Sequence, residues 1–313
     1  MRKIMCLLFS LVLVVAFVAP VFAQETDPTA PNRANIYLFV EYFRNRNMTD
    51  LLPVINSADY MAYTPFSPDG ALSNPTDAIP GENDMNAAFD LDFTGYIILA
   101  EGNYVGLIGY QEADFTGELF GTPPNGQHFE DQILFATEFD ENGMATSDIE
   151  VWNPIRFNQF MGWAPVEYTF NSQPWDMRLG STSTTPSQHH ATLQALWDAL
   201  SSGGSAADAN AYAADVVTHD YLADVSGAEA TVAMYDALAG LDGFTLVDTR
   251  IICEGDLCLT GVVTSVTATD PADEDGHVNI LWMAVQRFVD GKIAEEWWLY
   301  DNAALWAFLP PAD

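Results

Sequence analysis

Apolar residues recur at helical spacing in two separate stretches of the chain, residues 35–47 and residues 189–201. Residues three and four apart share one face of a helix, so each stretch predicts an amphipathic helix with one buried side. The apolar positions are Ile36, Phe39, Val40 and Phe43 in the first stretch, and Leu193, Leu196, Trp197 and Leu200 in the second. The chain therefore opens the same pattern twice.

The elements that follow these helices also occur twice and in the same order. A short helical segment comes next in each copy, and a third helix is expected at residues 81–89 and 227–238. Strands are expected at 96–99, 104–110, 132–139 and 146–152, and again at 246–252, 257–266, 278–288 and 293–300. Such an order of elements is typical of an α+β unit, here three helices on a curved antiparallel sheet. We therefore predict two tandem cone-shaped α+β barrels, at residues 32–162 and 187–310, joined by a linker at 163–186.

The first residues have the pattern of a secretory signal. Arg2 and Lys3 precede a nearly continuous apolar run at residues 4–18, and Val21-Phe22-Ala23 places small residues where a signal peptidase cleaves. A membrane anchor is the alternative, but the apolar run is short for a spanning helix and polar residues follow it at once. We expect a signal peptide at residues 1–23, cleavage after Ala23, and a secreted or periplasmic protein that is free of the membrane.

The two cysteines of the expected mature chain, Cys253 and Cys258, flank a turn. A two-residue turn at Gly255-Asp256 makes Glu254 and Leu257 the closing pair, so the cysteines form the next pair of a β-hairpin. Opposed side chains come closest in a non-hydrogen-bonded pair, which favours a cross-strand disulfide. Two buried thiols, or half of a zinc site, remain the alternatives.

The charge balance excludes some partners. Asp and Glu number 44 against 10 Lys and Arg, a formal net charge of −34. A field of that sign repels phosphate backbones and anionic lipid, so neither nucleic acid nor a membrane surface is an expected partner. The spacing of Cys and His predicts no zinc site, and the acidic run at 270–275 lacks the residues of a helix–loop–helix calcium site. No metal and no cofactor are expected.

Two segments resemble a known family. Residues 117–126, Gly-Glu-Leu-Phe-Gly-Thr-Pro-Pro-Asn-Gly, are similar to a connection found in SnoaL-like polyketide cyclases of the nuclear transport factor 2-like superfamily. Residues 287–297, Arg-Phe-Val-Asp-Gly-Lys-Ile-Ala-Glu-Glu-Trp, resemble the closing hairpin of the same family. The resemblance extends over most of both copies and implies a ligand cavity between helices and sheet. Because the superfamily includes isomerases, cyclases and binding modules, it does not select one reaction.

The resemblance also implies where chemistry would occur. The acid/base of these cyclases is an Asp on the last strand, a position that corresponds to Glu150 in copy one and to Trp298 in copy two. Strand alternation places Asp148 and Trp152 on the face of Glu150, and Glu296 and Tyr300 on the face of Trp298. The family's pocket histidine corresponds to Phe135 and Ala284, neither of which carries protons. Further residues expected to line a cavity are Tyr60, Tyr63, Tyr110, His128 and, in copy two, His219.

Two hypotheses of function follow. The first is an exported module that binds a small apolar molecule, without catalysis in copy two. The second is an enzyme of the cyclase or isomerase type, in which Glu150 is the general acid/base on a carbonyl substrate. The outward residues Ile149, Val151, Trp297 and Leu299 are apolar, so we expect both sheet faces to be covered. The two sheets should then pack on each other as a dimer within one chain.

Overall fold

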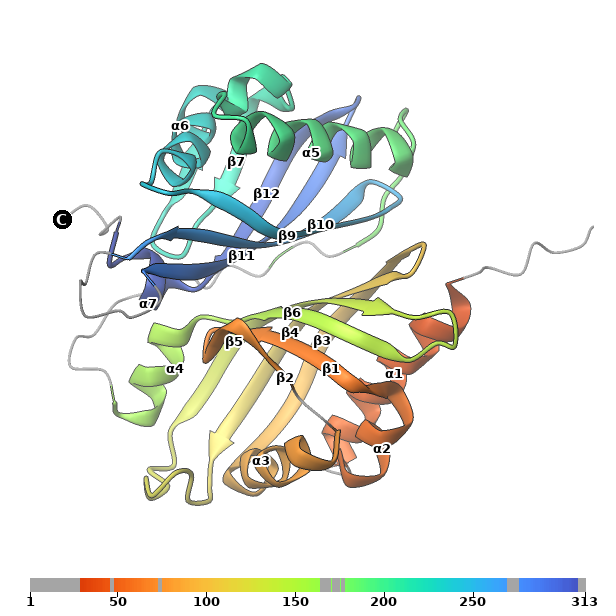
Figure 1. Cartoon of the computed structure of the whole chain (residues 1–313), viewed down its shortest axis with the longest axis vertical. Coiled ribbons are helices and arrows are strands. Elements are labelled where there is room, and N and C mark those ends of the chain that lie inside the picture. Colours follow the sequence, from red (N-terminus) through yellow and green to blue (C-terminus); the bar gives the residue numbers. More distant parts are fainter. Residues whose placement is uncertain are drawn as a thin grey trace, which may run out of the picture.

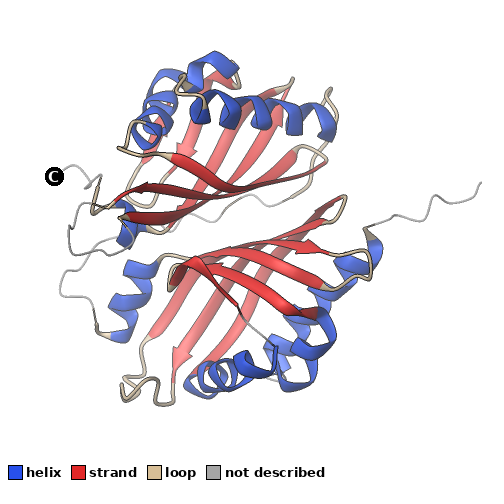
Figure 2. Cartoon of the chain, viewed as in Figure 1, coloured by secondary structure: helices blue, strands red, loops and turns tan. Residues whose placement is uncertain are grey.

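Two six-stranded sheets form the centre of the molecule and face each other (Figure 1). The computed structural model describes residues 29–45, 48–72, 75–163, 170, 175, 178–268 and 276–308. The strand orders are β2-β1-β6-β5-β4-β3 and β8-β7-β12-β11-β10-β9, so the second sheet repeats the topology of the first. Helices α1, α2 and α3 lie on the far side of the first sheet, and α5 and α6 on the far side of the second (Figure 2).

The elements follow the predicted order, with additions. The first unit contains α1 (Ala30–Asn45), α2 (Met48–Ile55), β1 (Asn56–Thr64), β2 (Ser67–Leu72), α3 (Pro75–Ala88), β3 (Phe89–Glu101), β4 (Tyr104–Phe115), β5 (His128–Phe139), β6 (Ala145–Val151) and α4 (Pro154–Met161). The second contains α5 (Pro186–Ser201), the short 3-10 helix η1 (Ala206–Ala209), β7 (Tyr212–His219), β8 (Asp224–Ser226), α6 (Ala228–Ala239), β9 (Thr245–Glu254), β10 (Leu257–Thr267), β11 (His277–Val289), β12 (Lys292–Tyr300) and α7 (Asn302–Leu305).

The sheets differ from the prediction in their pairing, and β3 and β4 are longer than the strands expected at 96–99 and 104–110. A hairpin, β1–β2 or β7–β8, lies between the helices of each unit, and its first strand pairs in parallel with the last strand of the meander. The sheets are therefore mixed and not purely antiparallel. Only long-range pairing reveals this, because β1 and β6 are separated by β2, α3, β3, β4 and β5, which form the crossover that parallel pairing requires.

Local signals explain where the second unit begins. Thr185 caps α5 by accepting from the backbone of Gln188, whose side chain accepts from Thr185 in return, and Pro186 occupies the first helical turn. The stripe of Leu193, Leu196, Trp197 and Leu200 is buried, as the pattern predicts. The helix thereby covers the sheet with its apolar side.

The outer faces of the two sheets share one apolar cluster. Ile149, Val151, Trp297 and Leu299 are all buried in it. A Cβ placed on Gly106 of β4 would lie 2.6 Å from Leu259 of β10, so the glycine allows this close approach. Apolar positions on both faces of a strand thus do indicate cover on both sides.

Equivalent turns make reciprocal contacts between the units. The backbone N–H of Cys253 donates to Glu101 (2.8 Å), and that of Ala100 donates to Glu254 (3.2 Å). Glu101 and Glu254 occupy the same position of the equivalent hairpins β3–β4 and β9–β10. Arg33 of α1 also donates to Glu254 (2.8 Å). Such a pattern, in which each copy presents the same residue to the other, is that of a two-fold interface.

The predicted hairpin and disulfide are confirmed. Glu254 pairs with Leu257, and Cys253 pairs with Cys258 with their Cα atoms 4.1 Å apart and their sulfurs bonded. Both cysteines are buried.

Removing this disulfide is expected to cost little, because it closes a very short loop. The loop-entropy relation gives a loss of about 2 kcal/mol in the free energy of unfolding for Cys253→Ala/Cys258→Ala. Guanidinium unfolding of the parent and the variant would measure it. A loss above about 4 kcal/mol would contradict the prediction and would indicate that the hairpin needs the bond to form.

Among the described residues, no helix is both long and apolar enough to cross a membrane. The predicted signal peptide, much of the linker at 163–186 and the acidic run at 270–275 lie outside the described residues.

Candidate functional site

A cavity of about 400 Å³ lies in the first unit, between the sheet and helices α1, α2 and α3. Its lining is largely aromatic and aliphatic, with rings from α1, β3 and β5 such as Phe39, Phe93 and Phe135. Cavities of this size hold small organic molecules. The unit therefore has the interior hollow that the pattern of helices and strands predicts.

Three carboxyl groups line this cavity. Asp148 and Glu150 come from β6, where alternation puts both on the inner face, and Glu82 reaches in from α3. Asp148 is 5% exposed, whereas Glu150 and Glu82 are half-buried. An apolar hollow thus contains three acidic groups, each of which is negative when it is ionised.

Burial raises the pKa of all three groups, and neighbouring carboxylates raise it further for Glu82 and Glu150. Burial, then the charges of Asp148 and Glu82, raise the pKa of Glu150 well above its usual value. Burial raises the pKa of Glu82 to about 7, with a contribution from Asp148. Burial also raises the pKa of Asp148 to about 6, although a hydrogen bond from Tyr60 and the charge of Arg250 oppose the rise. The three groups interact, so their protons leave as a coupled set and not independently.

Two buried polar atoms at the cavity wall have no partner in the described part of the chain. They are Oδ1 of Asp148 and Nε1 of Trp152. Trp152 directly follows β6 and lines the cavity together with Glu150. A buried polar atom without a partner is costly, so a bound molecule that supplies one would be favoured.

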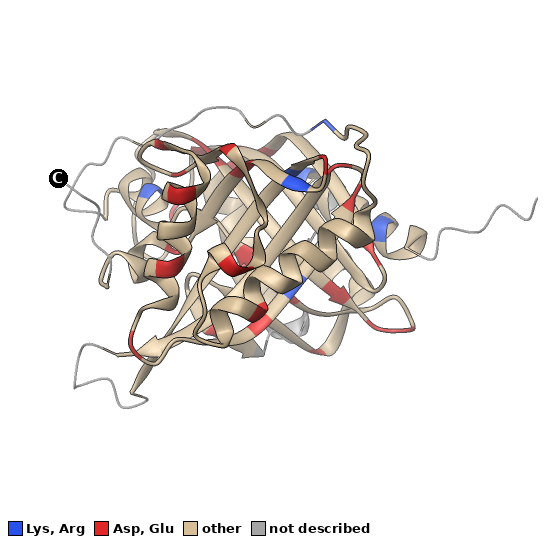
Figure 3. Ribbon diagram, turned by 90° about the horizontal axis from the view of Figure 1, so that it is seen from above, with Lys and Arg blue, Asp and Glu red and all other residues tan. Residues whose placement is uncertain are grey.

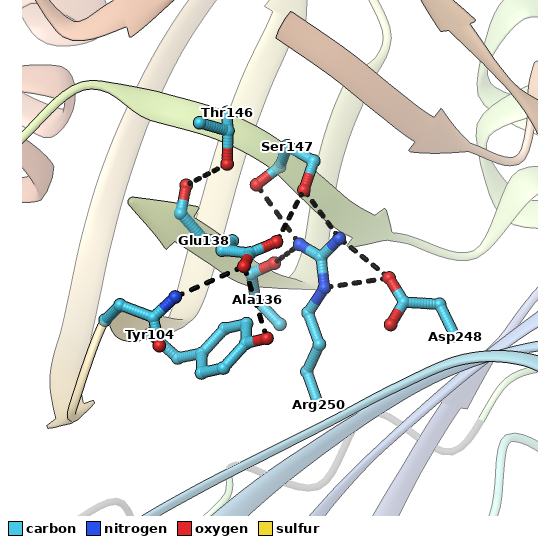
Figure 4. A network of polar contacts seen from close by, with 8 residues as sticks. Tyr104, Ala136, Glu138, Thr146, Ser147, Asp248 and Arg250 are labelled. Atoms are coloured by element: carbon cyan, nitrogen blue, oxygen red, sulfur yellow. Dashed lines mark hydrogen bonds and ion pairs between the residues drawn. The ribbon is translucent and has the colours of Figure 1, made fainter. Parts of the chain in front are cut away.

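One arginine of the second unit, Arg250, supports β6 of the first unit (Figure 4). Arg250 of β9 is 2% exposed, and its guanidinium donates to the carbonyl of Ala136 (2.6 Å), to the carbonyl of Ser147 (3.1 Å) and to Oγ of Ser147 (2.8 Å). Asp248 pairs with the same guanidinium at 2.8 Å. Because Ser147 adjoins Asp148, the positive charge lies just behind the acidic wall of the cavity.

The structure brings together some of the predicted pocket residues. Tyr60, Phe135 and Trp152 line the cavity with Asp148 and Glu150. Phe135 pairs directly with Glu150 across β5 and β6. Phe135 and Trp152 line the hollow without filling it.

Tyr63, Tyr110 and His128 do not line this cavity, and strand parity explains all three. Each lies beside a residue that does: Ala62, Gln111 and Phe129 respectively. Neighbouring residues of a strand point to opposite faces, so the three side chains are on the outer face.

These three side chains have other surroundings. Tyr63 packs against the apolar cluster between the sheets, and the hydroxyl of Tyr110 accepts from the backbone of Trp175 (2.6 Å). His128 is exposed and pairs with Asp114 (2.8 Å).

One group of described residues could hold a metal ion. Ligand atoms of Glu112, His128 and Glu130 lie within 4.8 Å of one another on the outer face of β4 and β5. His128 and Glu130 are exposed, and Glu112 is half-buried. The group lies outside the cavity and does not contribute to its chemistry.

The interior of the second unit is packed with aromatic rings. Trp298 and Tyr300 contact Trp282, with ring centres 4.4 and 5.0 Å apart, and Tyr235 packs on Trp298 at 4.9 Å. Trp298 pairs with Ala284 as Glu150 pairs with Phe135, so the predicted equivalence of Glu150 and Trp298 holds in the register. At these positions the indole occupies volume where copy one has a carboxylate facing a hollow.

The other predicted residues of copy two also have partners. Glu296, the counterpart of Asp148, is fully buried and accepts from Thr218 (2.9 Å) and Tyr235 (3.2 Å). His219 stacks on Trp297 and pairs with Asp224 and Glu295.

Glu296 gives the second unit a pH-dependent stability. Burial raises its pKa to about 8. A carboxyl group whose folded pKa exceeds its unfolded value stabilises the fold at low pH, and that contribution is lost as the pH rises from about 4.5 to about 8. In this pH window the free energy of unfolding of the parent should fall, relative to that of Glu296→Gln, by up to about 1.4 kcal/mol per pH unit.

Urea unfolding of both proteins at pH 5, 6, 7 and 8 would measure this difference, with Glu141→Gln in an exposed turn as the control. A difference that does not change with pH would contradict a proton held at Glu296.

Sequence reasoning missed Glu82 and Arg250. Glu82 is one acid among 44, and only its place on α3 brings it to the cavity. Arg250 did carry a signal, since a lone arginine in the apolar strand Thr245–Glu254 must find acceptors when buried. Glu82 is far in sequence from the other two acids of the cavity, and Arg250 is far from Ala136 and Ser147, the acceptors in the first unit.

Comparison with known proteins gives a family for the second unit. Residues 193–296 match the family described as SnoaL-like domain. Among solved structures, AclR from Streptomyces galilaeus, named as a hydroxylase, is 22% identical, with a TM-score of 0.38 over 44% of this chain and 99% of its own. A protein from Jannaschia sp. CCS1, named as a SnoaL-like polyketide cyclase, is 13% identical, with a TM-score of 0.39 over 44% and 94%.

A third structure, IdmH from Streptomyces antibioticus, named as a polyketide cyclase, is 18% identical, with a TM-score of 0.36 over 42% and 98%. The search of curated proteins gives no match. Residues 193–296 of the second unit therefore match the SnoaL-like domain family, and the first unit repeats the sheet topology of the second.

Proposed function

We propose that the first unit binds a small, mainly apolar carbonyl compound and that Glu150 transfers a proton at the carbon next to the carbonyl. The observation that carries the proposal is Glu150 itself, a carboxyl group that faces an apolar cavity of about 400 Å³ beside Asp148 and Tyr60. A carboxylate in apolar surroundings is a stronger base than one in water, because burial raises its pKa.

The proposed step is the removal of a proton from the α-carbon, which converts the ketone into its enolate. The Glu150 carboxylate takes the proton from the α-carbon, the C–H electron pair forms a C=C bond, and the carbonyl pair moves to oxygen. The unpartnered Nε1–H of Trp152 donates to the resulting enolate oxygen. Glu150 then returns the proton to the same or another carbon. Alternatively the enolate carbon attacks a second carbonyl, whose electron pair moves to its oxygen, and that oxygen takes the proton from Glu150.

The second unit, in this proposal, is a scaffold. Trp298 replaces the acid/base, so no proton transfer of this kind is expected there. The reciprocal contacts of Glu101 and Glu254 support an intramolecular pseudo-dimer of domains at residues 32–162 and 187–310. A disulfide at Cys253–Cys258 supports export, as the residues at 1–23 predict.

The test is hydrogen–deuterium exchange at the α-carbon of 1-indanone in D₂O, followed by proton NMR at neutral pH. Exchange accelerated by the protein above the buffer rate would support the proposal. If 1-indanone binds but does not exchange faster, the first hypothesis stands instead: a binding module, which the apolar lining favours.

A further inference from the structure

The cavity of the first unit presents negative groups and no positive ones to a ligand. Glu82, Asp148 and Glu150 line it, and among the described residues no Lys, Arg or His does. Asp148 is 5% exposed, lines the hollow, and keeps its Oδ1 without a hydrogen-bond partner. The site therefore contains three acidic groups and at least one acceptor atom that no described residue satisfies.

The nearest buried cation does not serve this purpose. Arg250 acts on Asp148 and Tyr60 from behind β6, but its guanidinium is bound to Ala136, Ser147 and Asp248. Its positive charge lowers the pKa of Asp148 on β6, but the guanidinium does not enter the cavity.

The remaining wall suits an organic cation. Aromatic rings of Phe39, Phe66, Phe135 and Trp152 line the hollow, and Phe39–Phe135 and Phe66–Trp152 pack edge to face at 5.5 and 5.3 Å. Aromatic faces attract ammonium groups and also bury the apolar part of a ligand. Asp and Glu outnumber Lys and Arg along the chain (Figure 3), and this net negative charge adds a field that concentrates cations.

We propose that this cavity selects organic cations: an amine with an aromatic or alicyclic body, whose ammonium group lies among Glu82, Asp148 and Glu150. The inference rests on the proposed function only in taking this cavity as the ligand site, and it narrows the substrate to an amine-bearing carbonyl compound. It disfavours carboxylates and phosphates, because an anionic ligand would be desolvated in this hollow with no positive group to pair with and would be repelled by any ionised carboxylate there.

Binding of a cation should also change the protonation of the site. The groups that face the cavity are Glu82 from α3, Asp148 and Glu150 from β6, and Tyr60 from β1, with Arg250 behind β6. An ammonium favours the ionised carboxylates, so binding should release protons and strengthen as the pH rises from 5 to 8. A neutral ligand should not show this dependence.

Titration calorimetry with three matched probes tests the proposal: 1-naphthylmethylamine, 1-naphthalenemethanol and 1-naphthoic acid. At pH 7.5 the amine is expected to bind at least tenfold more tightly than the alcohol, with proton release in buffers of different ionisation enthalpy, and the acid is expected not to bind. Glu82→Gln should lower the amine-to-alcohol affinity ratio several-fold. Asp84→Asn removes an exposed charge from the same helix and should leave that ratio within twofold.

The outcomes separate this inference from the proposed function. Equal affinity for amine and alcohol, or tighter binding of the acid, overturns cation selection while leaving the cavity as a ligand site. An amine preference that Glu82→Gln and Asp84→Asn reduce equally also overturns it, because the attraction would then come from the general field. If none of the probes binds, both the inference and the ligand site in the proposed function are overturned.

Discussion

Glu150→Gln is expected to slow α-carbon exchange of 1-indanone by about 10²–10⁴-fold, the range that general acid–base catalysis by one positioned side chain contributes. Glutamine keeps the shape of the side chain but cannot take a proton. Because the pKa of Glu150 is raised well above its usual value, the parent's exchange rate should also rise with pH as the carboxylate forms. Proton NMR of the ketone over time measures both effects.

Two controls make this result specific. Glu130→Gln neutralises an exposed carboxylate on the outer face of β5, and its exchange rate should match the parent's. Glu150→Asp keeps a carboxyl group but shortens its reach, so partial activity is expected. An exchange rate in Glu150→Gln equal to that of the parent would refute Glu150 as the base.

The second large effect concerns Arg250. Arg250→Met should lower the free energy of unfolding by about 3 kcal/mol, because it strands buried acceptors on Ala136 and Ser147 and removes a charged partner of Asp248. The same change should raise the pKa of Asp148 above its present value of about 6, since Arg250 lowers it. Guanidinium unfolding measures the first effect, and carbon-detected NMR titration of the carboxyl groups measures the second.

Arg44→Met is the matched control. Arg44 also pairs with a carboxylate, Asp92, and with a backbone carbonyl, that of Phe93, but its side chain is 33% exposed. Its loss should cost less than about 1 kcal/mol, as for other surface pairs. If Arg250→Met proves too unstable to purify, Arg250→Lys keeps the positive charge but not the planar guanidinium. The pKa of Asp148 in that variant should stay near its value in the parent. Equal losses in the free energy of unfolding for Arg44→Met and Arg250→Met would contradict a larger contribution from the buried contacts of Arg250 between the two units.

Most of the fold could be predicted because its signals are local. Apolar spacing predicts α5, and the Gly255-Asp256 turn predicts the hairpin that Cys253 and Cys258 close. The parallel pairing of β1 with β6 was not predicted, since it joins strands far apart in the chain. Pairing of that kind depends on how the whole unit closes and not on any single segment.

The site was predictable only where one strand determined it. Asp148 and Glu150 share a face of β6, and Trp152, directly after the strand, continues the same alternation into the cavity. Tyr63 and Tyr110 were placed in the cavity because their chemistry suited an enolate, although their parity on β1 and β4 is wrong for it. Residue type was a weaker guide there than strand geometry.

By itself, the sequence determined the two copies, their order of elements and the disulfide hairpin. It also determined that Asp148 and Glu150 share a face of one strand, and that Trp298 stands in the second copy where the first has Glu150. These depend on contacts between residues close in the chain, or on comparison of one copy with the other. Tertiary structure alone decided that Glu82 joins Asp148 and Glu150, and that Arg250 of one unit braces the strand of the other. Such contacts arise when separate elements close around a common hollow, and no local spacing specifies which polar side chains then meet.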